Sequence, residues 1–500
     1  MTPTIAARRG KVRVVLALAF ASLGHVPCTQ AQPAPADPAS TVAGGGLGAA
    51  RPWGRSRENA GPPQVFSTPT GGGLGAARPW GRSPEPGLGD VLRTIAARSP
   101  DLLAARASWQ QAAAQQQQAR AAWFGKVDAY ALSQHYNDPR LTRPITLPPN
   151  VANYPFSADQ FGYGLNVQLP LDLSGQIAAE VDAARAHTRG ARWSADDVRL
   201  RALLQGADIY RNLQALAGQR LALDQQLQAL QASARSAGAG MAVGTISRVN
   251  MLRVEAAVAA AQAQIAALEG QQRKLRAELA ALMGRPGFDD AVAPPPSGPS
   301  RLPVNPDQDP PSILAAQSSL LASQDKVRAA QRAMLPQFAV TAGWNRNAVH
   351  VETQPIDTWQ VNLGVTFNLW SGGAQRSAVD AAQAAATVAE QRLKGAQDRL
   401  RAAREGAAAM WNAEEQAWRA AQSGLKAASM SARIEQDRFR SGLGSATELI
   451  DADAALAAAR AGAASALAGW WQSDDALRYA YGEPPAALHD DNRSASDAQP

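Results

Sequence analysis

The sequence is poor in the residues that soluble enzymes and disulfide-bonded domains depend on. Its 500 residues include one cysteine, five histidines and only 6% aromatic residues. One cysteine cannot form an intramolecular disulfide, and no two histidines have the spacing of metal ligands. Neither a phosphate-binding G-x-x-x-x-G-K-[ST] loop nor a G-x-S-x-G nucleophile turn occurs. We therefore expect no cofactor, no metal and no enzymatic activity.

Acidic pairs and basic residues give no sign of chemistry either. The pairs Asp196-Asp197, Asp289-Asp290 and Asp474-Asp475 are interpreted as solvated helix faces or loops, because nothing apolar around them would shift a pKa. The formal net charge is +7, but no run of Lys and Arg resembles a phosphate-tracking patch. The sequence therefore gives no support to nucleic-acid binding.

Residues 1–31 have the anatomy of a secretory signal peptide. A basic segment is followed by the apolar run Val14–Leu23 and a small-residue end at Ala31. Cleavage there would remove four positive charges and Cys28, leaving a net charge of +3. A lipid anchor on Cys28 is the alternative, but His25-Val26-Pro27 lacks the apolar and small residues that such a signal needs. Twin-arginine export is not expected either, because Gly10-Lys11 follows the paired arginines where that signal has two apolar residues.

After this segment the sequence has no long apolar run, so no membrane-spanning helix is expected and any insertion must use strands. Residues 32–87 are interpreted as a flexible Gly/Pro-rich arm, in which GGGLGAARPWGRS occurs twice, at residues 44–56 and 71–83. A phosphate-binding loop is excluded because both copies lack lysine and a strand-to-helix setting.

A much longer repeat organises the rest of the chain. Leu165 and Val167 match Leu363 and Val365 at an offset of 198, which also relates Gly244 to Gly442 over about 120 ungapped residues. Upstream the offset is 211, so the first copy has thirteen extra residues, expected in a polar loop over 137–153. The expected domains are a first repeat (88–290), a Pro-rich linker (291–309), a second repeat (310–485) and a flexible tail (486–500).

Each copy is predicted to contain a helix, two strands joined by a loop, a very long helix and a returning long helix. From Leu200 onward, apolar residues recur at intervals of three, four and seven residues, as they do in coiled coils. The long helices should run from near Ser174 to Ala237 and from near Gly372 to Phe439. About 65 residues span roughly 95 Å, three times a bilayer core. The returning helices should begin near Ser247 and Ala446.

The predicted strands alternate apolar and polar residues, which suits either a half-buried soluble sandwich or a transmembrane barrel. The barrel is favoured because long helices leave no second sheet to cover the apolar face. The residues expected to face lipid or its interface are Tyr163, Leu165, Val167, Trp344, Trp359, Val361, Leu363, Val365 and Phe367. Those expected to line a pore are Asn166, Gln168, Asn362, Thr366 and Asn368.

Four strands cannot close a barrel, and open edges in hydrocarbon cost several kcal/mol per unpaired backbone group. The barrel must therefore be shared between chains. Two chains would give eight strands and a filled lumen, whereas three would give twelve and room for a channel. We expect a mostly helical, internally duplicated protomer whose homo-trimer combines a transmembrane β-barrel with an α-helical tunnel.

The element order, the duplication and the two helix-turn-helix tips resemble the TolC-like family of outer membrane factors over roughly residues 88–485. The resemblance implies an outer-membrane duct whose tips dock a periplasmic adaptor carried by an inner-membrane pump. The matching tip residues are Val243, Gly244, Thr245, Asn250, Gly442, Glu448, Leu449 and Asp451. The tips depart from the family pattern at Thr245 and Asn250.

In that family polar contacts near the tips hold the tunnel shut. The corresponding candidates are Glu435, Asp437, Arg438 and Arg440, which are also consistent with ordinary solvated helix charges. The expected cargo is a protein or toxin of a type I secretion system, because many efflux-type relatives carry a proper lipid-anchor signal. Multidrug efflux is the alternative, and a purely structural periplasmic coiled coil would leave the strands unexplained.

Overall fold

A computed structural model describes residues 87–141, 147, 156–242, 247–299, 308–348, 356–441 and 443–488. The expected signal peptide, the duplicated motif of the arm and all but the first residues of the expected tail lie outside these ranges. So do Val243, Gly244, Thr245 and Gly442 of the tips.

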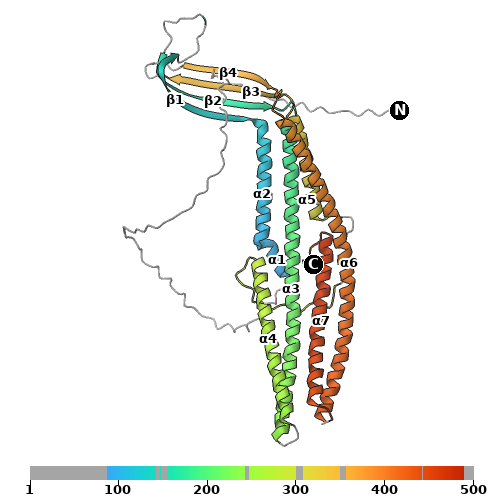
Figure 1. The fold of residues 1–500 in the computed structure, drawn as a ribbon. Coiled ribbons are helices and arrows are strands. Elements are labelled where there is room, and N and C mark those ends of the chain that lie inside the picture. The colour runs from blue at the N-terminus through green and yellow to red at the C-terminus, as the bar shows by residue number, and fades with distance from the viewer. Residues whose placement is uncertain are drawn as a thin grey trace, which may run out of the picture. The chain divides into compact units, whose positions relative to one another are not determined.

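Two copies of one set of elements make up the described chain (Figure 1). The first contains α2 (Pro100–Ala121), β1 (Lys126–Leu141), β2 (Phe156–Leu171), α3 (Gln176–Ala242) and α4 (Arg248–Leu282). The second contains α5 (Pro311–Arg332), β3 (Gln337–Ala348), β4 (Ile356–Thr366), α6 (Ala374–Arg440) and α7 (Ala446–Ala480). Matching helices have 22, 67 and 35 residues in both copies, which confirms the predicted duplication.

The helices begin and end where local chemistry requires it. α3 and α6 contain no proline and are rich in alanine, so nothing interrupts their 67 residues. α2 and α5 start with proline at the first position, where no backbone N–H is needed. A short helix, α1 (Leu88–Arg98), precedes α2 and is separated from it by Ser99, because the residue before a proline avoids the helical conformation. A 3-10 turn, η1 (Ala122–Phe124), then leads into β1.

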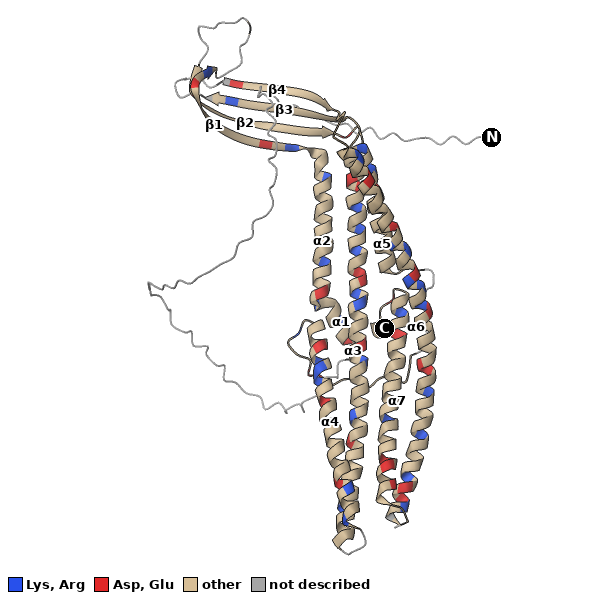
Figure 2. Ribbon diagram, in the orientation of Figure 1, with Lys and Arg blue, Asp and Glu red and all other residues tan. Residues whose placement is uncertain are grey.

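The four strands form one antiparallel sheet in the order β1-β2-β3-β4. The β2–β3 pairing joins the two repeats, and the long helices run from the sheet (Figure 1). Charged residues are frequent along the helices and sparse on the sheet (Figure 2).

Two strand boundaries were predicted wrongly. β4 ends at Thr366, which pairs with Gln337, so the predicted lipid-facing Phe367 and pore-lining Asn368 lie just beyond the strand. The ladder stops there because Pro336, before Gln337, has no N–H to donate. β1 continues to Leu141 through part of the stretch expected to be a loop, and a register shift between His135 and Arg140 accommodates it.

The main apolar core lies where α1 and the end of α4 pack on the middle of α3. Leu92 and Ile95 of α1, Tyr210 of α3 and Leu279 of α4 are completely buried there. An added Cβ at Gly206 would lie 2.3 Å from the Ile95 side chain, so only glycine allows this approach. The core anchors α1 to the long helix α3.

Among the described helices, α4 is long and apolar enough to cross a membrane by length and composition alone. Alanine accounts for much of that apolarity, and α4 packs alongside α3 rather than standing alone.

Candidate functional site

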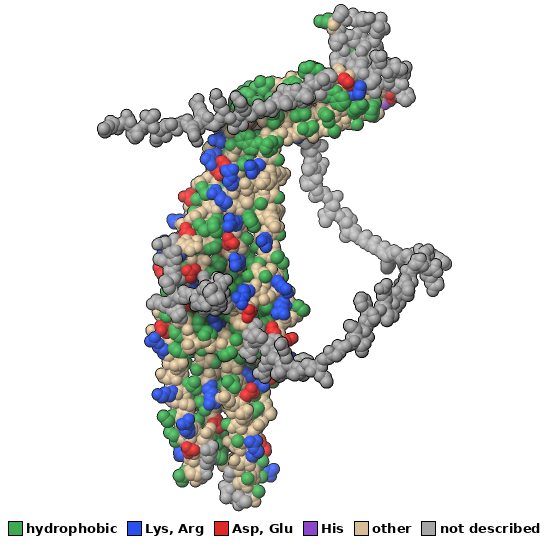
Figure 3. Space-filling view, turned by 180° about the vertical axis from the view of Figure 1, so that it is seen from behind, with side chains coloured by type: hydrophobic (Ala, Val, Ile, Leu, Met, Phe, Trp, Pro, Cys, Tyr) green, Lys and Arg blue, Asp and Glu red, His purple; other side chains and the backbone are tan. Residues whose placement is uncertain are grey.

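The register of the sheet places the alternating residues in continuous rows on two opposite faces. Val167, Ala342 and Val361 lie opposite one another, as do Leu165, Trp344 and Trp359 in the next row. Leu363 is 69% exposed on this face although it is surrounded by other apolar residues. Hydrophobic side chains accordingly gather over the sheet in Figure 3. Such a large exposed apolar surface requires a cover that the described part of the protomer does not supply.

Aromatic residues border the apolar face toward the β-hairpin loops. The Tyr163 and Trp344 rings make an edge-to-face contact with centroids 5.9 Å apart. Tyr163 lies in the same row as Arg346 and Asp357, and the Arg346 Nε lies 3.0 Å from the Asp357 carboxylate. An apolar band that ends in aromatic rings and a charged pair matches the passage from hydrocarbon to a polar interface.

The opposite face is polar. Gln168, Thr341 and Asn362 form one row, and Asn166 lies in the next beside Gly343. The structure therefore brings together the predicted pore-lining residues of β2 and β4, Thr366 included, on the face away from the apolar band. Within the described chain, the outer edges of β1 and β4 have no strand partner. Their backbone groups must pair with another chain if the sheet lies in hydrocarbon.

At the far ends of the helices, the two tips are built on capped returning helices. Ser247 caps α4 by accepting a 3.4 Å hydrogen bond from the Asn250 backbone N–H. Ser445 caps α7, and the Glu448 carboxylate accepts the Ser445 N–H at 2.9 Å. This reciprocal capping box lowers the pKa of Glu448. Glu448 thus has a structural role at the tip that sequence reasoning missed, although its spacing from Ser445 was a visible signal.

The remaining described tip residues differ in exposure. Leu449 is buried and Asp451 is exposed. The two tips of one protomer touch, because Arg253 of α4 donates a 3.1 Å hydrogen bond to the Thr447 hydroxyl of α7.

Among the candidate aperture charges, Glu435 and Arg438 form an ion pair within α6. Arg438 binds both carboxylate oxygens of Glu435, at 2.9 and 3.0 Å. The Asp437 carbonyl accepts the Ser441 N–H at the end of α6, and the Arg440 side chain lies outside the described atoms. A residue that sequence reasoning missed joins the helices instead: Gln436 of α6 donates to the buried Asp453 of α7 at 3.0 Å.

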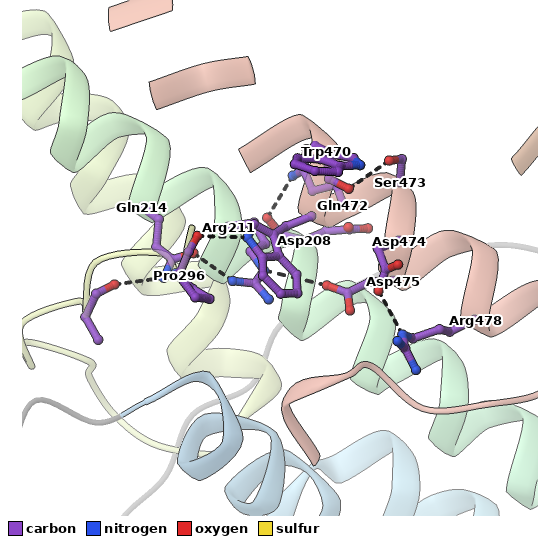
Figure 4. Close-up of polar contacts among 12 residues, drawn as sticks. Asp208, Arg211, Gln214, Pro296, Trp470, Gln472, Ser473, Asp474, Asp475 and Arg478 are labelled. Carbon is purple, nitrogen blue, oxygen red and sulfur yellow. Dashed lines mark hydrogen bonds and ion pairs between the residues drawn. The ribbon is translucent and has the colours of Figure 1, made fainter. Parts of the chain in front are cut away.

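Near the middle of α3 and the C-terminal end of α7, buried charges join the two repeats (Figure 4). The Nε atom of Arg211 in α3 lies 3.6 Å from the carboxylate of Asp475 in α7. Both side chains are at least 97% buried. The adjacent Asp474 accepts hydrogen bonds from Arg478 at 2.8 Å and from the Trp411 indole of α6 at 3.1 Å. The guanidinium of Arg211 also lies 4.4 Å from the Trp471 ring centroid.

The interpretation of Asp474-Asp475 as a solvated pair was therefore wrong, and Asp197 is also buried. The signal was present in the sequence: Ala468, Trp471, Asp475 and Arg478 follow the three and four spacing of one buried helix stripe. Burial raises the pKa of Asp475 to about 7 and that of Asp208 to about 6.

The sequence matches the outer membrane efflux protein family over residues 91–285 and 306–483. The chain belongs to this family. Outer membrane efflux proteins are channels rather than enzymes, and they work as trimers with a periplasmic adaptor and an inner-membrane pump. The chain is thus an outer-membrane channel subunit of the tripartite kind, with a long periplasmic helical extension.

Solved structures share this fold at low sequence identity. The Campylobacter jejuni CmeC outer membrane channel is 16% identical, with 82% of this chain and 88% of that one covered and a TM-score of 0.69. The Vibrio cholerae outer membrane protein VceC is 19% identical. The match covers 79% of this chain and 96% of VceC, with a TM-score of 0.67. The Neisseria gonorrhoeae MtrE outer membrane channel, solved in its open state, is 18% identical. The match covers 81% of this chain and 90% of MtrE, with a TM-score of 0.66. No curated protein matches the sequence.

These comparisons confirm the predicted fold class, a mostly helical protomer that contributes to a shared β-barrel and a helical tunnel.

Proposed function

We propose that three copies of this chain form one continuous duct that exports a protein cargo in a type I secretion system. The observation that carries the duct is the two-faced sheet with unpaired outer strands. Three such sheets joined edge to edge would place Leu363 and its row toward lipid and Asn362 and its row toward a polar lumen.

The duct itself has no means of choosing its cargo. Its proposed lining consists of polar strand residues and alanine-rich helices, a surface that favours no particular molecule. Selection then belongs to the pump and the adaptor. The proposal of a protein cargo is supported by the sequence around Cys28, which does not resemble the lipid-anchor signal of many efflux-type relatives.

The cargo proposal is tested by deleting the protein in its native cell. Secreted proteins are compared by mass spectrometry with and without the protein, and growth is measured on dyes, detergents and antibiotics. Loss of one or a few large secreted proteins with unchanged drug tolerance is the expected result. Normal secretion with increased drug sensitivity would replace protein secretion with drug efflux and leave the duct in place.

A matched variant separates the duct from the rest of the export system. Asn362→Trp would place a bulky ring on the proposed lumen face, whereas Val361→Trp would place the same ring on the proposed lipid face. Single-channel conductance in planar bilayers should fall for Asn362→Trp and stay unchanged for Val361→Trp. Equal conductance of the two variants would contradict the assignment of the faces.

A further inference from the structure

The two tips of the protomer occupy equivalent positions but carry opposite charge. The repeat offset of 198 equates residues 235–255 with residues 433–453. The first window contains three arginines and one glutamate, a formal net charge of +2. The second contains three arginines and five acidic residues, a net charge of −2. The repeat has therefore kept the lengths of the helices on either side of the tip and reversed the charge of the window.

The reversal is sharpest on the returning helices, which expose these charges. Arg253 of α4 and Asp451 of α7 are equivalent by the offset, and both are exposed. Arg248 adds a second exposed positive charge at the start of α4. Glu448 adds a negative one at the start of α7, where the Ser445 hydrogen bonds favour its ionised form.

Contacts within the protomer do not cancel this difference. Arg248 and Arg253 make no ion pair with any residue that the structure describes, and the tip-to-tip bond of Arg253 goes to the neutral Thr447 hydroxyl. At the second tip Glu435 pairs with Arg438, which removes one charge of each sign. If the buried Asp453 is left out of the count, residues 433–453 still contain four acidic residues and three arginines.

We propose that the two tips recognise oppositely charged segments of the docking partner. The α3–α4 tip binds an acidic end of a partner's helical hairpin, and the α6–α7 tip binds a basic end. The inference rests on the proposed docking of an adaptor at these tips and adds the chemistry that this adaptor must present. Exposed charges of this kind set the orientation and the rate of association more than the affinity.

In a trimer the basic and acidic tips alternate around the mouth of the tunnel. Each groove between neighbouring tips therefore has one basic and one acidic side. A hairpin with an acidic and a basic flank fits such a groove in one orientation only, because the reverse orientation places like charges together. Successive grooves present the two signs in opposite order, so they are not equivalent docking sites for one partner.

The test uses the purified full-length trimer and two synthetic helical-hairpin peptides. The peptides differ only in carrying glutamates or lysines on the turns next to their loop. A photo-crosslinking benzoylphenylalanine is placed at Val249 or at Thr447, which are equivalent by the offset and both exposed. The glutamate peptide should crosslink about five-fold more at position 249 than at position 447, and the lysine peptide about five-fold more at position 447. A five-fold ratio is the upper end of what one exposed charge pair contributes to binding.

The exchange variant Arg253→Asp with Asp451→Arg reverses the sign at these two positions and brings both windows to a formal net charge of zero, without changing the net charge of the chain. It should remove the preferences of the two peptides, as high salt should in the wild-type protein. Arg273→Asp, on α4 away from the tip, is the matched control and should leave both preferences unchanged. Equal crosslinking at both positions, no crosslinking, or unchanged preference in the exchange variant would overturn the inference.

Conductance and trimer mass are measured on the same preparations. An intact conducting trimer without peptide preference would reject the charge inference alone. A protein that neither forms a trimer nor conducts would reject the proposed duct.

Discussion

At the scale of single residues, the buried pair Arg211 and Asp475 shows how one position connects the two repeats. Asp475 occupies a core position of α7, and its charge faces α3 of the other repeat rather than water. Taking a carboxylate out of water costs several kcal/mol, and one ion pair at 3.6 Å only partly offsets this cost. Such a pair adds little net stability, but it favours one alignment of α7 on α3.

The raised pKa of Asp475 predicts a pH-dependent stability. Its pKa is about 7 in the folded chain and 3.8 for an ordinary aspartate, so between these values the folded state binds more protons than the unfolded state. Its contribution is therefore fully present below about pH 4 and is lost as the pH rises through 7. We expect the thermal unfolding temperature of the trimer to rise from pH 8 to pH 5, and to rise less in Asp475→Asn.

Circular dichroism at a series of pH values measures both proteins. Asp451→Asn, at an exposed position, is the control and should keep the wild-type slope. An identical slope in Asp475→Asn would show that this carboxyl group does not titrate in that range.

Gly218 on α3 predicts a second effect at a single position. An added Cβ there would lie 2.5 Å from the Cβ of Ala464 on α7, closer than two carbon atoms can approach. Gly218→Ala should therefore destabilise the helix pair by about 1–3 kcal/mol despite the better helix propensity of alanine.

Chemical denaturation provides the measurement. Gly270→Ala on α4 is the matched control, since an added Cβ there meets no atom within 4 Å of the described chain, and it should be neutral or stabilising. Ala464→Gly should restore part of the stability of Gly218→Ala. A stable single variant would mean that α3 and α7 are less closely packed than described.

At the scale of elements, each strand has two faces with opposite requirements. Adjacent residues such as Asn362 and Leu363 point to opposite sides, so a change of one position exchanges a polar surface for an apolar one. The same alternation in β2 and β3 extends both faces across the repeat boundary.

Leu363→Arg and Asn362→Arg should therefore have very different effects. A charge on a lipid-facing strand position costs about 2–4 kcal/mol near the bilayer midplane, whereas a lumen position tolerates it. We expect much less detergent-resistant trimer in outer membranes for Leu363→Arg and near-normal amounts for Asn362→Arg. Gel mobility of unheated membrane samples measures this, and a greater loss for Asn362→Arg would reverse the assignment of the faces.

At the scale of the whole molecule, the described protomer is incomplete by itself. The outer edges of β1 and β4 are unpaired in the described sheet, and its apolar face is uncovered. The helices also expose long faces, most of all α6, along which most residues are exposed. Other copies of the chain and lipid would cover these surfaces.

Native mass spectrometry in detergent should give a mass of three chains. Each chain should have the mass expected after removal of residues 1–31. A stable monomer that still conducts would contradict the shared barrel, and a lipid-modified chain beginning at Cys28 would contradict the predicted cleavage.

The sequence by itself was sufficient for the order of the repeated elements and the approximate length of the long helices, because these follow from periodicities along the chain. The offset of 198 predicted two equal long helices, and the alternation of Val361, Leu363 and Val365 predicted a two-faced strand. Both patterns depend only on 3.6-residue and two-residue repeats. The end of β4 was missed because it depends on Pro336, which directly precedes the partner strand β3.

Only the tertiary structure decided which polar residues are buried and which helices meet. Asp475 is paired because α7 packs against α3, more than 260 residues earlier in the chain, and Arg253 contacts Thr447 because the two tips lie side by side. Burial and pairing depend on distances between elements, and distances between elements are set by packing of the whole chain rather than by local pattern.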